Sequence, residues 1–215
     1  MNLTQELLAY KENVLANIPK EVMAVMEAGA QEMVVNEVGK NALKVGDTIP
    51  SFKLSNAVGQ EIDIKECLEQ GPLILNFYRG AWCPYCNLEL QAYQEVLSDI
   101  NAKGANLVAI SPELPDSSMS LKEKHNLGFE LLSDVDHKVS KEFGIVFKLN
   151  DDLRNLYKQF GFDLDGAQGN TNGELPLPAT YVVDTDGTIL LADMHLDYTK
   201  RLEPTDAIAA IKTSK

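Results

Sequence analysis

Apolar residues in the first 35 positions recur mostly at three- and four-residue spacings, which predicts amphipathic helices. The stripe consists of Leu8, Leu15, Ile18, Val22 and Val25. Pro19 interrupts it, and proline is tolerated in the first turn of a helix but not in the interior. We therefore predict two helices, one ending near Asn17 and one over residues 19–35, within an N-terminal helical arm over residues 1–42. We expect the arm to pack on the main domain as a lid, with contact to a second copy as the alternative.

After a turn at residues 46–50, the pattern changes to short apolar strands and helices. Segments 52–54 and 61–64 alternate apolar and polar residues, as an antiparallel hairpin does. Further strands are predicted over 73–78, 106–110, 129–132, 180–183 and 188–192. Helices are predicted over 87–101, 116–125, 139–143, 150–160 and 204–212. Residues 166–173 are rich in glycine and asparagine, and we interpret them as a turn-forming insertion.

The order of these elements predicts an α/β domain over residues 43–215. The strand at 73–78, the helix after it and the strand at 106–110 form a unit whose two strands are parallel and joined by a right-handed crossover. The first hairpin and the last two strands are antiparallel. We therefore expect a central mixed sheet flanked by helices.

Composition narrows the classes of function. The 215 residues are 45% hydrophobic, which suits one globular domain with an appendage. The apolar runs are far shorter than the roughly 18–20 residues of a membrane-spanning helix, and the N-terminus lacks the pattern of a secretory signal, so we expect a cytoplasmic protein. A net charge of −13 disfavours nucleic acid and anionic membrane surfaces as partners.

Two of the three cysteines, Cys83 and Cys86, are separated by two residues and lie between a buried strand and a helix. A helix N-terminus stabilises a thiolate and can lower a cysteine pKa to about 3.5–7.5. The spacing also lets one sulfur resolve an intermediate formed on the other. The sequence therefore predicts a redox-active pair.

The run Arg79-Gly80-Ala81-Trp82-Cys83-Pro84-Tyr85-Cys86 resembles the CxxC-bearing branch of the peroxiredoxins, the AhpC/TSA family of the thioredoxin superfamily. Segments 45–52, 109–112 and 178–187 follow the family's order, so the resemblance runs from about residue 43 to the C-terminus and leaves the arm outside. It implies a thioredoxin-like fold. It also implies a thiol peroxidase, without cofactor or metal, that reduces hydrogen peroxide or alkyl hydroperoxides through a Cys83–Cys86 disulfide. Thioredoxin or a glutathione-type reductant would regenerate the enzyme.

Two departures from the family pattern keep other functions open. The alignment puts Cys83 where peroxiredoxins have a threonine, and Pro178 where they have an arginine. Pro178 also has the position of the cis-proline of thioredoxin, which favours a protein disulfide reductase as the alternative. Arg79 is then the candidate cation of a peroxide site. A non-enzymatic redox sensor or metal carrier is the third hypothesis.

The resemblance does not decide which sulfur attacks. Peroxiredoxin alignment selects Cys86, whereas we favour Cys83, because it lies nearer the helix N-terminus and is expected to be the more exposed. Trp82 is expected to form a wall of the active site, with Pro84 as a further supporting residue. Glu89 has the family's position, but a solvated helix-face carboxylate is an equal alternative.

Overall fold

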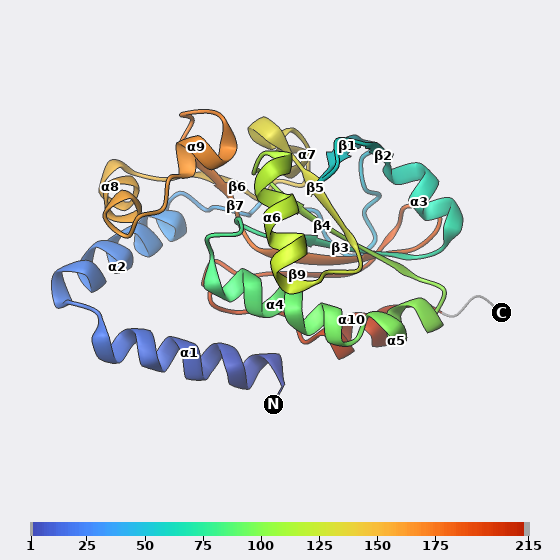
Figure 1. Cartoon of the computed structure of the whole chain (residues 1–215), viewed down its shortest axis with the longest axis horizontal. Coiled ribbons are helices and arrows are strands. Elements are labelled where there is room, and N and C mark those ends of the chain that lie inside the picture. Colours follow the sequence, from blue (N-terminus) through green and yellow to red (C-terminus); the bar gives the residue numbers. More distant parts are fainter. Residues whose placement is uncertain (1, 213–215) are drawn as a thin grey trace.

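The computed structural model describes residues 2–212 and has a seven-stranded mixed sheet at its centre (Figure 1). The strands of this sheet are β1 (Lys53–Asn56), β2 (Glu61–Asp63), β3 (Leu73–Phe77), β4 (Asn106–Ser111), β5 (Glu130–Ser133), β8 (Ala179–Val183) and β9 (Ile189–Met194). They lie in the order β2-β1-β5-β4-β3-β8-β9. Strand β3 is parallel to β4 and antiparallel to β8, which confirms the predicted mixed sheet.

The helices cover both faces of the sheet. They are α3 (Ile64–Gln70), α4 (Pro84–Glu95), α5 (Leu97–Ala102), α6 (Pro115–His125), α7 (Lys138–Glu142) and α10 (Pro204–Ala210). The single helix predicted over 87–101 is wrong in two respects. It begins earlier, at Pro84, and it divides at Val96, whose φ of −105° departs from helical geometry.

Side chains of β3 alternate between two apolar cores. Ile74 packs into the core that contains α4, α5 and α10, whereas Leu73 and Leu75 pack into the core that contains α3 and α7. Asn76 points toward α4, because its side chain bonds to Glu89 of that helix. Strand β3 therefore places the Asn76 amide against the buried face of α4, the helix that carries the cysteines.

The N-terminal arm consists of α1 (Leu3–Asn17) and α2 (Lys20–Val35), as predicted. Helix α1 runs along α4 (Figure 1), and its residues Leu3 and Leu7 belong to the buried core of the main domain. Helix α2 packs on α8 (Asp151–Gln159). The arm is thus a packed part of this protomer, as the lid interpretation expected.

The segment after α8 contains more regular structure than predicted. Helix α9 (Leu164–Gln168) occupies part of the stretch interpreted as a turn-forming insertion. Its first turn is capped by the side chain of Asp163, which accepts a hydrogen bond from the Gly166 amide at 3.0 Å, so a local cap overrides the glycine. Strands β6 (Val146–Lys148) and β7 (Glu174–Pro176) form a small separate antiparallel sheet.

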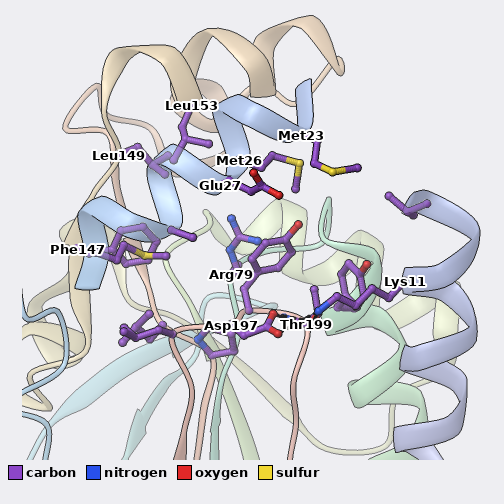
Figure 2. Close-up of a pocket in the computed structure, with 18 of the residues that line it drawn as sticks. Lys11, Met23, Met26, Glu27, Arg79, Phe147, Leu149, Leu153, Asp197 and Thr199 are labelled. Atoms are coloured by element: carbon purple, nitrogen blue, oxygen red, sulfur yellow. Dashed lines mark hydrogen bonds and ion pairs between the residues drawn. The ribbon is translucent and has the colours of Figure 1, made fainter. Parts of the chain in front are cut away.

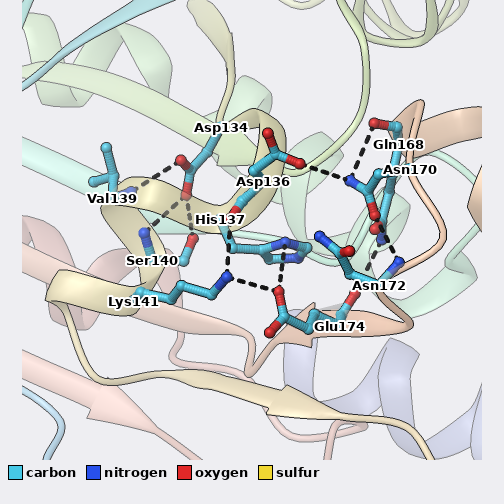
Figure 3. Close-up of polar contacts among 10 residues, drawn as sticks. All are labelled: Asp134, Asp136, His137, Val139, Ser140, Lys141, Gln168, Asn170, Asn172 and Glu174. Carbon is cyan, nitrogen blue, oxygen red and sulfur yellow. Dashed lines mark hydrogen bonds and ion pairs between the residues drawn. The ribbon is translucent and has the colours of Figure 1, made fainter.

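A buried polar cluster joins the turn before α7 to β7 (Figure 3). The Asp134 carboxylate accepts hydrogen bonds from the backbone amides of Val139 and Ser140, at 2.9 and 2.8 Å. The buried His137 has a left-handed φ of 58°, and its Nδ1 lies 3.9 Å from Glu174 Oε2.

Within residues 2–212, no helix is both long enough and apolar enough to cross a membrane.

Candidate active site

Both cysteines of the pair are held at the start of α4. Cys83 is the N-cap residue of this helix, and Pro84 takes its first position, where the missing N–H is not needed. The two thiols are reduced, and Cys83 and Cys86 are only 1% and 0% exposed. The expectation that Cys83 is the more exposed is therefore wrong, because both belong to the apolar core formed by α1, α4 and the sheet.

The electrostatic environment distinguishes the two thiols. Burial by itself would raise the pKa of Cys83, but the hydrogen bond with Cys86 and the charges of Arg79 and Arg201 lower this pKa to about 6. The pKa of Cys86 is raised, by burial and by the neighbouring Cys83. The surroundings therefore favour the thiolate on Cys83 over the thiolate on Cys86.

Arg201 is a site residue that the sequence did not indicate. It lies between β9 and α10, and its Nη2 is 3.2 Å from Cys86 Sγ. Its Nε donates to the Glu89 carboxylate, and the guanidinium is almost completely buried. The family pattern has an arginine at the position of Pro178. In this protein an arginine contacts the cysteine pair from a different position, 201. No motif around Arg201 marks it.

Glu89 is the buried partner of this arginine. It is 0% exposed, and its Oε1 accepts a hydrogen bond of 2.8 Å from Asn76. Burial raises the pKa of Glu89 to about 7, although the charge of Arg201 opposes that shift. The alternative of a solvated helix-face carboxylate is therefore wrong.

Arg79, the second arginine whose charge acts on the pair, is surrounded by three aromatic rings. Its guanidinium carbon is 4.8 Å from the ring centre of Trp82, 5.5 Å from that of Tyr157 and 4.5 Å from that of Tyr198. Its Nη2 also donates to the Tyr157 hydroxyl. Cation–π contacts of this kind fix the guanidinium while leaving its charge available to the thiolate. Trp82, expected to form a wall of the site, thus packs on Arg79, whereas Tyr157 and Tyr198 were not expected from the sequence.

Gly80 permits the tight loop that joins β3 to α4. Its φ is +147°, and an added Cβ would lie 2.4 Å from Trp82 Nε1 and 2.7 Å from Glu113 Oε1. The Glu113 carboxylate accepts a hydrogen bond of 2.8 Å from the Ala81 amide, and burial raises its pKa to about 7. The loop is thus packed too closely for any side chain at position 80.

Pro178 does not have the geometry expected for a cis-proline. All peptide bonds of residues 2–212 are trans, so the expectation of a cis bond at Pro178 is wrong. The residue lies in the short link between β7 and β8 and, like Arg79, lines a cavity. The thioredoxin-like feature that favoured a protein disulfide reductase is therefore absent at this position.

The fold and the cysteine site together define a thiol oxidoreductase with a thioredoxin-like fold. Residues 45–192 match the model of the AhpC/TSA family, and the chain belongs to this family. The match begins after the helical arm.

Relatives and solved structures agree with this assignment. The chain is 31% identical to peroxiredoxin Bcp of Escherichia coli K12 over 105 residues, which are 49% of this chain and 67% of that protein. It is 27% identical to a putative peroxiredoxin of Mycobacterium tuberculosis H37Rv over 157 residues, 73% of this chain and 88% of that protein. The crystal structure of peroxidoxin BcpB from M. tuberculosis has a TM-score of 0.62 at 23% identity and covers 78% of this chain and 96% of its own.

Proposed function

We propose that this chain is a thiol peroxidase in which Cys83 attacks the peroxide and Cys86 resolves the product. One observation carries the proposal: two buried arginines lie beside two cysteines at one helix N-terminus, and their charges lower the pKa of Cys83. Membership of the AhpC/TSA family supports an oxidoreductase that takes a peroxide as substrate and electrons from a thiol. The particular roles of the two cysteines rest on the site's electrostatics.

The chemistry begins with the Cys83 thiolate, which the surroundings favour. The Cys83 thiolate attacks the terminal oxygen of the peroxide, the O–O bond breaks, and the leaving alkoxide or hydroxide takes up a proton to give an alcohol or water. Cys83 is then a sulfenic acid. The Cys86 thiol attacks this sulfur, forming the Cys83–Cys86 disulfide and releasing water. One peroxide thereby oxidises two thiols.

The arginines supply the positive charge that the first step requires. Negative charge moves from Cys83 to the leaving oxygen, and fixed cations stabilise it without reorganisation. Arg79 and Arg201 both act on the Cys83 charge, and each is held by buried partners. Arg79 therefore supplies one cation of the peroxide site, and Arg201 supplies the other.

Burial of the pair favours a peroxide over a protein disulfide as oxidising substrate. Exchange with a protein disulfide requires a sulfur that the partner can approach, but Cys83 is only 1% exposed. Reduction of the Cys83–Cys86 disulfide requires local opening of the α4 N-terminus toward the reductant. We expect thioredoxin or a glutathione-type thiol as donor, in a reducing compartment such as the cytoplasm.

The organisation of the chain belongs to the same proposal. We assign residues 1–42 to the helical arm and residues 43–215 to the peroxiredoxin domain. Leu8 of α1 is 53% exposed and Val35 at the end of α2 is 70% exposed, so the arm offers apolar side chains that a homodimer would cover. Sedimentation of the wild type and Leu8→Lys would test this contact.

Mixing the reduced protein with hydrogen peroxide tests the mechanism. Trp82 is the only tryptophan and lies 4.8 Å from the Arg79 guanidinium, so its fluorescence reports on oxidation of the pair. We expect fast oxidation in the wild type, with two thiols lost per peroxide. Cys83→Ser should react no faster than free cysteine. Cys86→Ser should still react but stop at a sulfenic acid that dimedone traps, while Cys67→Ser serves as the matched control and behaves as wild type.

Two results would contradict parts of this mechanism. A wild-type rate equal to that of free cysteine would exclude the peroxidase. Fast oxidation of Cys83→Ser together with an inert Cys86→Ser would reverse the roles of the two sulfurs and leave the peroxidase intact. Turnover with thioredoxin and with glutathione, measured separately, would identify the donor.

A further inference from the structure

A cavity of about 500 Å³ is lined by the arm, by Arg79 and by the segment around α8 (Figure 2). Its walls are largely apolar, and the side chains from the arm and from the segment around α8 include Val14, Ile18, Met23, Met26, Leu149 and Leu153. Ligand cavities of about 300–1,000 Å³ hold molecules of drug size. The volume is therefore far larger than hydrogen peroxide requires.

The cavity adjoins the site already described through Arg79, while Cys83 and Cys86 themselves are buried and do not line it. Arg79 lines the cavity, and its side chain points toward α2 (Figure 2). Tyr85 and Tyr198 line the cavity as well. Arg79 both lines the cavity and lowers the pKa of Cys83, so one guanidinium is shared by the cavity and the cysteine site. A molecule whose reactive end meets Arg79 would have its remaining atoms in the apolar part.

The N-terminal arm supplies a large part of the cavity lining. Helices α1 and α2 contribute much of the lining, and both lie outside residues 45–192, the part that matches the family. Methionine side chains adapt to ligands of varied shape, and Met23, Met26 and Met33 all face the cavity. The arm therefore adds side chains to the lining of this cavity that the part matching the family does not supply.

The charges around the cavity balance. Its charged lining residues are Lys11, Arg79, Glu27 and Asp197, and Lys11 is already paired with Asp197 at 3.0 Å. Within residues 2–212, Glu27 has no ion-pair partner, and Figure 2 shows it beside Met26 above Arg79. A second carboxylate at this end would meet apolar walls and a like charge. The lining thus suits an uncharged molecule.

We propose that the arm-lined cavity binds the hydrocarbon part of a bulky, uncharged organic hydroperoxide and presents its O–OH group to Arg79 and Cys83. This substrate class rests on the proposed peroxidase function. The terminal oxygen is transferred to Cys83 Sγ as the O–O bond breaks, and the alkoxide takes up a proton and leaves the cavity as the alcohol. Cys86 then closes the disulfide and releases water, as with hydrogen peroxide.

Three peroxides test the proposal on the full chain: hydrogen peroxide, the hydroperoxide of methyl linoleate and that of free linoleic acid. We expect the ester to have the highest kcat/KM, by at least about tenfold, since even single methylene contacts in a hydrophobic pocket give about 10–200-fold. Ala30→Trp fills the cavity, whereas Ala28→Trp is the matched control. Both alanines are exposed on α2, but only Ala30 lines the cavity.

Ala30→Trp should lower kcat/KM for the ester by at least about tenfold and leave the reaction with hydrogen peroxide unchanged. Ala28→Trp should change neither rate. Glu27→Gln should narrow the difference between the ester and the free acid. Equal rates for ester and hydrogen peroxide in the wild type, or equal losses on both in Ala30→Trp, would overturn the cavity proposal while leaving the peroxidase. Inertness toward all three peroxides would instead refute the proposed function.

Discussion

The low pKa of Cys83 depends on a hydrogen bond from its own partner, and Cys86→Ala removes that donor. Burial raises the pKa of Cys83, and the hydrogen bond from Cys86 is the largest of the effects that lower it. A hydrogen bond to a charged group contributes about 1.5–3 kcal/mol, and one pKa unit corresponds to about 1.4 kcal/mol. We therefore expect Cys86→Ala to raise the pKa of Cys83 by about 1–2 units.

This shift changes the amount of nucleophile at neutral pH. With a pKa of about 6, roughly nine-tenths of Cys83 is thiolate at pH 7. In Cys86→Ala, the thiolate fraction falls to between about one-half and one-tenth. Cys86→Ser keeps a hydroxyl donor of similar size, so its midpoint should stay nearer that of the wild type.

Ultraviolet absorbance of the thiolate, followed from acid to alkaline pH, measures these midpoints directly. The titration is done in a Cys67→Ser background, since Cys67 is half-buried and burial raises its pKa. A midpoint in Cys86→Ala equal to that of Cys86→Ser, both near the wild-type value, would refute the hydrogen bond as the cause. The charges of Arg79 and Arg201 would then account for the low pKa.

Two further predictions concern the packing around the site. Gly80→Ala should destabilise the fold and slow peroxide reduction, because the new Cβ would lie 2.4 Å from Trp82 Nε1. Urea unfolding measures the first effect and a peroxidase assay the second. Wild-type values in both assays would contradict the close packing at Gly80. Burial lowers the pKa of His137, so the folded protein holds it neutral while the unfolded chain protonates it below about pH 6.5, and stability falls as pH drops through that value. His137→Phe should weaken this acid dependence by up to about 1.4 kcal/mol per pH unit. A difference in unfolding free energy between variant and wild type that stays constant from pH 7 to pH 5 would exclude His137 as the source.

The N-terminal arm contacts the loop that carries Arg201. Lys11 of α1 bonds to Asp197 and Thr199 at 3.0 Å, in the loop that also carries Tyr198 and Arg201. The same loop therefore holds one arginine against Cys86 and one tyrosine over Arg79. A segment outside the family match thus holds the loop that carries Arg201, whose guanidinium lies 3.2 Å from Cys86 Sγ.

Local patterns in the sequence were enough to predict most helices and strands. Apolar spacing and Pro19 located α1 and α2, and alternation located the strands, because each depends on residues close together in the chain. The spacing of Cys83 and Cys86 between a buried strand and a helix likewise predicted a reactive pair. The sequence could place this pair at a helix N-terminus because the cap and the first turn are local features.

Only the tertiary structure decided what surrounds the pair. Arg201 contacts Cys86 although the two residues are 115 positions apart in the sequence, and the same arginine forms an ion pair with the buried Glu89. No local sequence pattern could predict either contact. Burial also reversed the expected exposure of Cys83, since α1 and the sheet close over the start of α4. The sequence by itself predicted a redox-active pair at a helix N-terminus, whereas long-range packing decided which charged groups lie beside each sulfur and which cavity adjoins Arg79.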